Sequence, residues 1–147
     1  MKTNSRHLRI IAIIAIRLPS EISCLSYVVL VIIKEKRGEV ILRDISNELE
    51  ILKSIILDTV AVDKIILFGS YANGTPNEES DIDLYVVMKD NTEMNELDAL
   101  KSIYKGLRYK LNMPIDILTG RKSSFERRAK LLTLENDIIS EGITLYG

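Results

Sequence analysis

Apolar residues along this 147-residue chain fall into two kinds of pattern. Short runs rich in β-branched residues, typical of buried strands, occur at 65–68, 82–87 and 115–118. Over 45–56 and 97–111, apolar residues recur every three or four positions, which is typical of a helix with one buried face. Strands that alternate with helices in this way predict an α/β fold, in which a small sheet is layered with helices.

Polar residues set the expected ends of the two longer helices. Asp44 can cap the first helix, and Thr92 can cap the second, which runs to about Leu111. The expected buried residues are Ile45, Leu49, Leu52 and Ile56 in the first helix, and Leu97, Leu100, Tyr104, Leu107 and Leu111 in the second. Lys101, Lys105, Arg108 and Lys110 fall on the exposed part of the second helix, as expected for a solvated surface.

The last third of the chain is expected to add two shorter helices and a strand. Ser123 or Ser124 can cap a helical stretch after the third strand, and a further helix stops at Gly142, a residue that suits the end of a helix. Residues 143–146 can then add a short edge strand. The basic cluster Arg127, Arg128 and Lys130 is the best candidate for contact with an acidic partner or a nucleotide.

Residues 1–40 have the least specific pattern. The apolar runs at 10–16 and 27–33 are too short to span a bilayer, and the second run suits a strand or a buried helix. A basic start before an apolar run is similar to a signal peptide, but no small-residue cleavage site follows Ile16, so secretion is not expected. This N-terminal apolar extension is either a stretch upstream of the true start or an added surface for packing or for a partner.

Two motifs in the middle of the chain carry the candidate chemistry. Gly69 and Ser70 end the first apolar strand, and glycine allows a sharp turn at positive φ that exposes backbone N–H groups to a phosphate. Further along, Asp81 and Asp83 are two apart in a strand, so both carboxylates project from one face, with Cα atoms roughly 6.5–7 Å apart. Ile82, Leu84 and Val86 face the other way and are expected in the core.

A third carboxylate can join this pair. Two neighbouring carboxylates repel each other unless a divalent cation neutralises them, and Mg²⁺ prefers hard oxygen ligands of this kind. Asp116, on the third strand, is well placed to complete a site for two ions about 3.5–4 Å apart, the arrangement that supports phosphoryl displacement. The alternative is an ordinary turn and a solvated strand edge. An Asp-x-Asp within an otherwise apolar strand counts against that alternative.

Composition narrows the class of protein. Hydrophobic residues make up 46% and charged residues 28%, and the net charge of −1 gives no pull toward nucleic acid or an anionic membrane. Neither is therefore expected as a direct substrate or partner. Cys24 is the only cysteine, which excludes an internal disulfide and fits a cytoplasmic protein. His7 is the only histidine, so histidine-based catalysis or metal binding is not expected.

The order of these motifs resembles the signature of the polymerase-β-like nucleotidyltransferases, and in particular their short "minimal nucleotidyltransferase" branch. The resemblance rests on Gly69-Ser70, a spacing of ten residues, Asp81-x-Asp83 and the later strand residue Asp116. It covers about 44–147 and implies an α/β (α+β) fold, with a small mixed sheet, helices packed on one face and the carboxylates on the other. Residues 41–147 are then the expected nucleotidyltransferase domain, after the N-terminal extension over 1–40.

The resemblance also implies a role for each motif residue. Gly69 and Ser70 hold the β- and γ-phosphates of ATP through backbone N–H groups and the serine hydroxyl. Asp81 and Asp83 bind two Mg²⁺ ions, and Asp116 holds the ion that lowers the pKa of the attacking hydroxyl. All three aspartates are thus expected to be catalytic and metal-binding. The products are a nucleotidylated acceptor and pyrophosphate.

No residue identifies the acceptor. Larger members of the superfamily bind it with an additional domain, whereas this chain is expected to end after its catalytic core, so another molecule must present the hydroxyl. In the short branch that molecule is commonly a helical HEPN-type toxin, whose tyrosine receives AMP from its antitoxin. The resemblance therefore implies an adenylyltransferase antitoxin in a homo- or hetero-oligomer. Two alternatives are a non-catalytic steric antitoxin and a small-molecule, antibiotic-type nucleotidyltransferase assembled as a homodimer.

Overall fold

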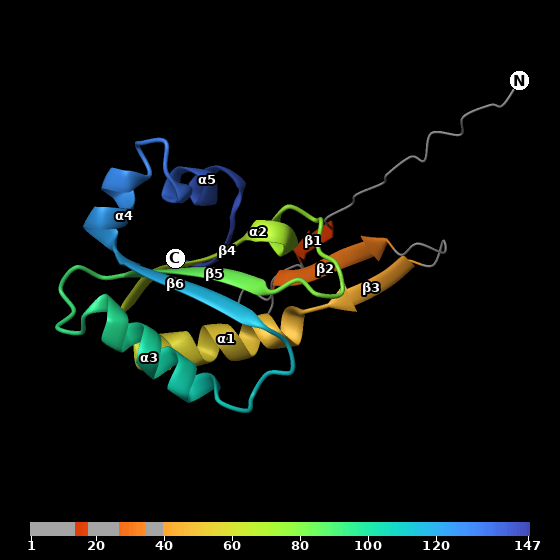
Figure 1. The fold of residues 1–147 in the computed structure, drawn as a ribbon, viewed down its shortest axis with the longest axis horizontal. Coiled ribbons are helices and arrows are strands. Elements are labelled where there is room, and N and C mark those ends of the chain that lie inside the picture. Colours follow the sequence, from red (N-terminus) through yellow and green to blue (C-terminus); the bar gives the residue numbers. More distant parts are fainter. Residues whose placement is uncertain (1–13, 18–26, 35–39) are drawn as a thin grey trace, which may run out of the picture.

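The computed structural model describes residues 14–17, 27–34 and 40–147. In chain order, the elements of these residues are β1 (Ile14–Arg17), β2 (Tyr27–Lys34), β3 (Val40–Asp44), α1 (Ser46–Thr59), β4 (Val62–Phe68), α2 (Gly69–Ala72), β5 (Ile82–Met88), α3 (Glu96–Leu107), β6 (Ile115–Arg121), α4 (Lys122–Arg128), α5 (Leu134–Glu141) and β7 (Ile143–Tyr146). Helices and strands alternate from α1 to α4, as the hydrophobic pattern predicts (Figure 1).

The main sheet is mixed and has the strand order β6-β5-β4-β7. Strands β5 and β6 run parallel, whereas β4 is antiparallel to both of its neighbours. The parallel pair needs a crossover connection, which α3 provides. The apolar strands β4 and β5 occupy the centre of the sheet, where each has a neighbour on both sides.

The larger core lies between this sheet and the helices α1 and α3. The expected residues of α1 are all buried there: Ile45, Leu49, Leu52 and Ile56. Ile82, Leu84 and Val86 project into the same core from β5, so the expected apolar face of this strand is confirmed. Since burial of one large apolar side chain contributes about 1.5–3 kcal/mol, this layer is a major source of stability.

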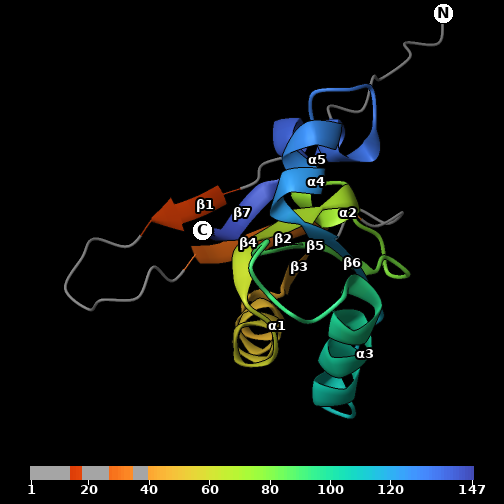
Figure 2. The same ribbon diagram turned by 90° about the vertical axis from the view of Figure 1, so that its left-hand side faces the viewer.

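A second, smaller layer covers part of the opposite face. There Tyr85 of β5 is buried against Phe125 of α4, with ring centroids 4.9 Å apart. Ile66 of β4 and Ile138 of α5 belong to the same cluster. Figure 2 shows α4 and α5 on one side of the sheet and α1 and α3 on the other. The expected helix-covered face is confirmed, and the structure adds a partial cover over the face that carries the aspartates.

Helix α3 differs from the prediction at both ends. Asn95, not Thr92, caps it, because the Asn95 side chain accepts a 2.8 Å hydrogen bond from the N–H of Asp98. The helix ends at Leu107 rather than Leu111.

The buried face of α3 also differs from the prediction. Of the predicted residues, Leu107 is buried and Leu100 and Leu111 are partly buried against the core, whereas Leu97 and Tyr104 are exposed. Ala99 and Ile103 complete the buried face instead. The Tyr104 hydroxyl accepts a 3.2 Å bond from the N–H of Ile117 and donates a 3.3 Å bond to the carbonyl of Ile115. Both groups belong to the edge strand β6, whose backbone needs such partners. Tyr104 therefore covers the sheet edge instead of entering the core.

The other helix ends follow the prediction in part. Ile45, not Asp44, is at the N-cap position of α1, but the Asp44 carboxylate accepts a 2.9 Å bond from the N–H of Ser46, the first residue of the helix. Helix α4 begins at Lys122, so neither Ser123 nor Ser124 is its cap. None of the helices in the described part of the chain has the length and apolar character needed to cross a membrane.

The C-terminal expectations are confirmed. Helix α5 ends at Glu141, directly before Gly142. Residues 143–146 form the edge strand β7, which pairs with β4.

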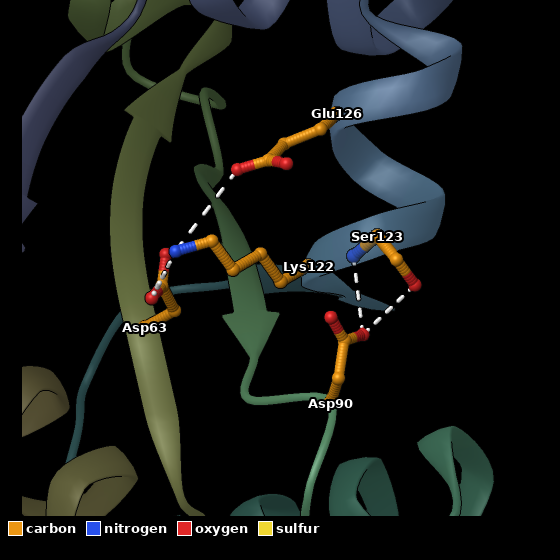
Figure 3. A network of polar contacts seen from close by, with 5 residues as sticks. All are labelled: Asp63, Asp90, Lys122, Ser123 and Glu126. Atoms are coloured by element: carbon orange, nitrogen blue, oxygen red, sulfur yellow. Dashed lines mark hydrogen bonds and ion pairs between the residues drawn. The ribbon is translucent and has the colours of Figure 1, made fainter.

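Polar contacts hold the start of α4 against the rest of the fold (Figure 3). Lys122 Nζ lies 2.9 Å from Asp63 Oδ1 on β4, and 4.0 Å from Glu126 Oε1 in the next turn of the helix. The N–H and the hydroxyl of Ser123 both donate to Asp90 Oδ1, at 3.1 and 2.9 Å. Asp90 lies two residues after the end of β5. The first turn of α4 is therefore attached to β4 through Asp63 and to the loop after β5 through Asp90.

The first three strands form a separate antiparallel sheet in the order β1-β2-β3. The apolar run at 27–33 is therefore a strand rather than a buried helix. The expected division between the N-terminal extension (1–40) and the nucleotidyltransferase domain (41–147) falls at the start of β3, whose first residue is Val40. The division itself stays a prediction. His7, Cys24 and residues 10–13 lie outside the described residues.

Candidate active site

Three residues on adjacent strands form one row across the aspartate-bearing face. Phe68, the last residue of β4, pairs with Asp83 of β5, and Asp83 pairs with Asp116 of β6. Paired positions of neighbouring strands project to the same face, so these two carboxylates lie side by side. Asp81 stands directly before β5 rather than within it. The structure thus brings the three predicted aspartates to one end of the sheet.

The turn from β4 into α2 brings the backbone against Asp83. Gly69 has a φ of +68°, and a Cβ atom there would collide with Asp83 Oδ2 and lie 2.9 Å from Asp83 Cγ. Only glycine fits this position without strain. The carbonyls of Gly69 and Ser70 accept backbone bonds from Asn73 (3.0 Å) and Thr75 (2.9 Å), which close the loop that follows. The predicted phosphate-binding turn is therefore next to the predicted metal ligands.

The three carboxylates act on each other electrostatically. Burial raises the pKa of the Asp83 carboxyl, and the negative charges of Asp116 and Asp81 raise this pKa further. Asp83 is partly buried, whereas Asp81 and Asp116 are exposed. Negative charge that gathers in this way is unfavourable unless a positive group neutralises it.

Positive side chains do not supply that neutralisation within the described residues. The ion pairs found there involve other acidic residues, and none includes Asp81, Asp83 or Asp116. Carboxylate oxygens suit Mg²⁺, so the chemistry of the donors fits a divalent cation. In the part of the chain that the structure describes, no three acidic, histidine or cysteine side chains converge closely enough to enclose an ion. The aspartate side chains would have to turn toward one another to share one.

The raised pKa of Asp83 gives a stability prediction. The carboxyl ionises more readily in the unfolded chain than in the folded protein, so its ionisation destabilises the fold as pH rises above about 4. In chelator at neutral pH, Asp83→Asn should therefore melt higher than the wild type, by roughly 1–3 °C once solvent screening is allowed for. The difference should vanish toward about pH 3, where the carboxyl is protonated in both states. Thermal melts across this pH range measure it.

Glu93→Gln is the control for this experiment. Glu93 is exposed in the loop between the end of β5 and α3, so a negative charge is removed away from the row. The difference in melting temperature between this variant and the wild type should stay smaller than that of Asp83→Asn as pH rises from about 3 to 7. A melting temperature for Asp83→Asn at or below that of the wild type at neutral pH would contradict the electrostatic account.

The helical cover that lies beside the row was not predicted from the sequence. Phe68 of the row and Leu118, two residues after Asp116, are partly buried against the cluster formed with α4 and α5, so the cover extends to the row. One feature of the sequence indicates this cover. Residues 84–88 are consecutively apolar, which is typical of a strand buried on both faces, whereas one open face would give alternation.

Arg128 of the predicted basic cluster has a structural role. Its Nε lies 2.9 Å from Oε1 of Glu135, whose side chain is only 3% exposed. The same oxygen accepts a 3.4 Å bond from the Tyr85 hydroxyl, and burial together with the charge of Glu135 raises the pKa of Tyr85 to about 12. Since a buried carboxylate needs such partners, Arg128 joins α4 to α5. Arg127 and Lys130 are exposed, as the sequence predicts.

Sequence comparison relates most of the chain to known proteins. Residues 45–144 match the family model described as "Nucleotidyltransferase domain". "Putative protein adenylyltransferase MJ1379" of Methanocaldococcus jannaschii is 35% identical over 98 residues, which span 67% of this chain and 95% of that protein. "Putative protein adenylyltransferase MJ0141" of the same organism is 35% identical over 80 residues, which span 51% of this chain and 81% of that protein.

Two solved structures are similar to about two thirds of the chain. One is described as a "putative nucleotidyltransferase" from Sulfolobus solfataricus; it covers 66% of this chain and 74% of its own, with 20% identity and a TM-score of 0.45. The other is a toxin-antitoxin structure with AMP-PNP, which covers 67% of this chain and 73% of its own, with 20% identity and a TM-score of 0.49.

Proposed function

Because the chain belongs to the nucleotidyltransferase domain family, we propose that it transfers AMP from ATP to a hydroxyl group of another protein. The observation that carries this proposal is the row of aspartates placed directly against the Gly69 turn. Transfer of a nucleotidyl group needs a site for the triphosphate and positive charge at the reacting phosphorus. The turn serves the first need, and the aspartates serve the second by holding cations.

The triphosphate of ATP is proposed to bind at Gly69 and Ser70. Backbone N–H groups at this turn and the serine hydroxyl donate to the β- and γ-phosphates. Because Gly69 has no side chain, the backbone of the turn lies directly against the Asp83 carboxylate, so phosphates bound at the turn would be next to cations held by Asp83.

Asp81, Asp83 and Asp116 are proposed to hold two Mg²⁺ ions. The three residues offer carboxylate oxygens at one end of the sheet, and no described lysine or arginine forms an ion pair with them. When bound, the ions supply the positive charge for the reacting phosphorus and lower the pKa of the acceptor hydroxyl.

The proposed reaction forms one bond and breaks one. The acceptor oxygen attacks the α-phosphorus of ATP, the bond from this phosphorus to the bridging oxygen breaks, and pyrophosphate leaves. Asp116 is exposed on the edge strand β6, so the acceptor can approach it from outside the sheet. Its carboxylate is the group assigned to orient the acceptor hydroxyl and to accept its proton.

A protein acceptor is proposed from the names of the two Methanocaldococcus jannaschii relatives, which describe protein adenylyltransferases. The motif resemblance narrows the proposal to a tyrosine of a cognate, helical HEPN-type toxin. This chain is then the antitoxin, and transfer of AMP silences its partner.

ATP is expected to bind only when Mg²⁺ or Mn²⁺ is present, because the triphosphate and the aspartates repel each other. Calorimetric titration should show that chelator lowers the affinity for ATP by about 100-fold or more, which corresponds to about 2.7 kcal/mol. Adenosine is the control, since it has no phosphate and should not depend on the metal. Equal affinity for ATP in magnesium and in chelator would contradict the metal site.

Co-expression with a helical protein encoded beside this chain tests whether that protein is the acceptor. Intact mass should show that this protein gains one or more adenylyl groups, and fragmentation should place them on a tyrosine. A partner that is inhibited without modification would favour the steric antitoxin. A partner that does not bind would favour the small-molecule enzyme.

A further inference from the structure

The turn between α4 and α5 exposes three leucines that no described part of the fold covers. Leu131, Leu132 and Leu134 are 58%, 102% and 46% exposed. Arg127 and Lys130 lie exposed beside them, and no acidic residue interrupts this stretch. These five residues form the leucine turn. Apolar side chains grouped at the surface between charged ones are typical of an interaction site.

Hydrogen bonds hold the leucine turn in one shape. The N–H of Leu131 donates to the Arg128 carbonyl at 2.9 Å, and the N–H of Thr133 donates to the Leu131 carbonyl at 3.0 Å. The Thr133 hydroxyl also donates to the Arg128 carbonyl (2.7 Å), and the Asn136 amide donates to the Ala129 carbonyl (2.8 Å). A bonded backbone therefore holds the leucines outward.

Helix α4, which leads into the turn, is anchored at both ends. Lys122 and Ser123 tie its first turn to β4 and to the residue that follows β5 (Figure 3). The ion pair between Arg128 and buried Glu135 ties its last turn to α5. A surface that is already ordered loses little conformational entropy when a partner binds, which favours tight association.

The leucine turn lies on the same side of the sheet as the aspartate row. Figures 1 and 2 both show α4 and α5 on the side that carries α2. The Asn73 amide, four residues after Gly69, lies 3.5 Å from Glu141 at the far end of α5. Helix α5 spans only about 12 Å at 1.5 Å per residue, whereas a small domain measures about 30 Å. A partner the size of a small domain that docks at the turn is therefore large enough to reach the site along the same side of the sheet.

We propose that the leucine turn is the docking surface for the acceptor protein, and that the acceptor presents an apolar groove between two helices with acidic residues on its rim. The inference deepens the proposed function and rests on it. The leucines match an apolar groove, and Arg127 and Lys130 match an acidic rim that also steers association. Docking at this place brings an acceptor hydroxyl to Asp116 from the open side of the row.

A second copy of the chain fits the leucine turn less well than a different protein. A symmetric dimer centred on the leucine turn would place this surface against itself, because a two-fold interface joins the same patch of both copies. Arg127 and Lys130 would then face the same residues of the partner copy, and like charges repel.

A photocrosslinker at the leucine turn identifies what binds there. The full chain with p-benzoylphenylalanine in place of Leu132 is irradiated in cells of the organism that encodes it, and the captured protein is identified by mass spectrometry. The same group in place of Leu97, exposed on the far side of the sheet on α3, is the control. The protein captured at position 132 should be the one that the wild type labels with ATP radioactive at its α-phosphate, and its crosslinked segment should combine acidic and apolar residues.

Transfer kinetics with that purified acceptor test the same surface quantitatively. Leu131→Asp combined with Leu132→Asp should raise the KM for the acceptor by about tenfold or more, with ATP affinity and kcat unchanged. Leu97→Asp should change none of these. Because both leucines are exposed, the double variant should melt like the wild type, and Leu132→Asp alone replaces it if the double variant does not fold.

The outcomes separate this inference from the proposed function. If the wild type labels no protein, the proposed function fails, and the docking surface for an acceptor fails with it. If the wild type and the double variant label the acceptor equally, the proposed function stands and the docking surface is wrong. Capture of a second copy of the chain at position 132, or of a protein that is never labelled, also overturns the inference.

Discussion

Asp116→Asn is expected to lower the rate of AMP transfer by roughly 10²–10⁴-fold, while much of the ATP affinity remains. Asp83 lies against the Gly69 turn, where the triphosphate is proposed to bind, and Asp81 stands two residues before it, so both are assigned to the nucleotide. Asp116 is exposed on the edge strand and is assigned to the acceptor hydroxyl. Its loss should therefore act on turnover more than on binding.

The Asp116→Asn variant should fold normally. Asparagine has nearly the same size as aspartate, and removal of this charge relieves repulsion on Asp83, whose pKa the Asp116 charge raises. Without metal, the melting temperature should equal or exceed that of the wild type.

Three measurements on one purified variant decide the role of Asp116: ATP affinity, melting temperature and transfer rate. Asp83→Asn is the comparison, since it should weaken both ATP binding and transfer. Unchanged transfer in Asp116→Asn would remove this residue from the site. An unfolded Asp116→Asn variant would show that this aspartate is structural.

Gly69→Ala is expected to abolish ATP binding and to destabilise the fold. A residue with a Cβ atom costs about 1–2 kcal/mol at this positive φ, and overpacking of a filled position costs about 1–3 kcal/mol more. The added methyl group collides with the Asp83 carboxylate, so it displaces a proposed metal ligand at the place where the triphosphate is proposed to bind. The sum is a large share of the about 5–15 kcal/mol that stabilises a typical domain.

A double-mutant cycle separates the two costs of Gly69→Ala. Asp83→Ala in the Gly69→Ala background removes the collision but keeps the backbone strain, so it should recover part of the lost free energy of unfolding. Urea denaturation of the four proteins measures this coupling, and calorimetry measures ATP binding. Purely additive effects, or a Gly69→Ala variant that binds ATP like the wild type, would show that Gly69 and Asp83 do not meet as the structure places them.

Patterns confined to neighbouring residues could be predicted correctly. Gly69 adopts the positive φ that its place after an apolar run indicates, and residues 45–56 bury the expected face of a helix. Tyr104 shows where such local reasoning stops. Its spacing suits the buried stripe of α3, but its hydroxyl pairs with the backbone of an edge strand that is remote in sequence. The hydroxyl of a tyrosine takes the position that its hydrogen-bond partner requires. The spacing of apolar residues carries no information about that partner.

The sequence by itself determined the strand–turn–strand unit, the spacing of Asp81 and Asp83 and the family of the chain, because each depends on residue types at short, ordered intervals. Only the tertiary structure decided which strand lies beside β5 and therefore that Asp116 pairs with Asp83. It also decided that α4 and α5 cover part of the aspartate-bearing face, and that Arg128 pairs with Glu135 while the leucine turn stays exposed. These features depend on contacts between segments far apart in the chain, which the free energy of the whole fold selects and no local pattern records.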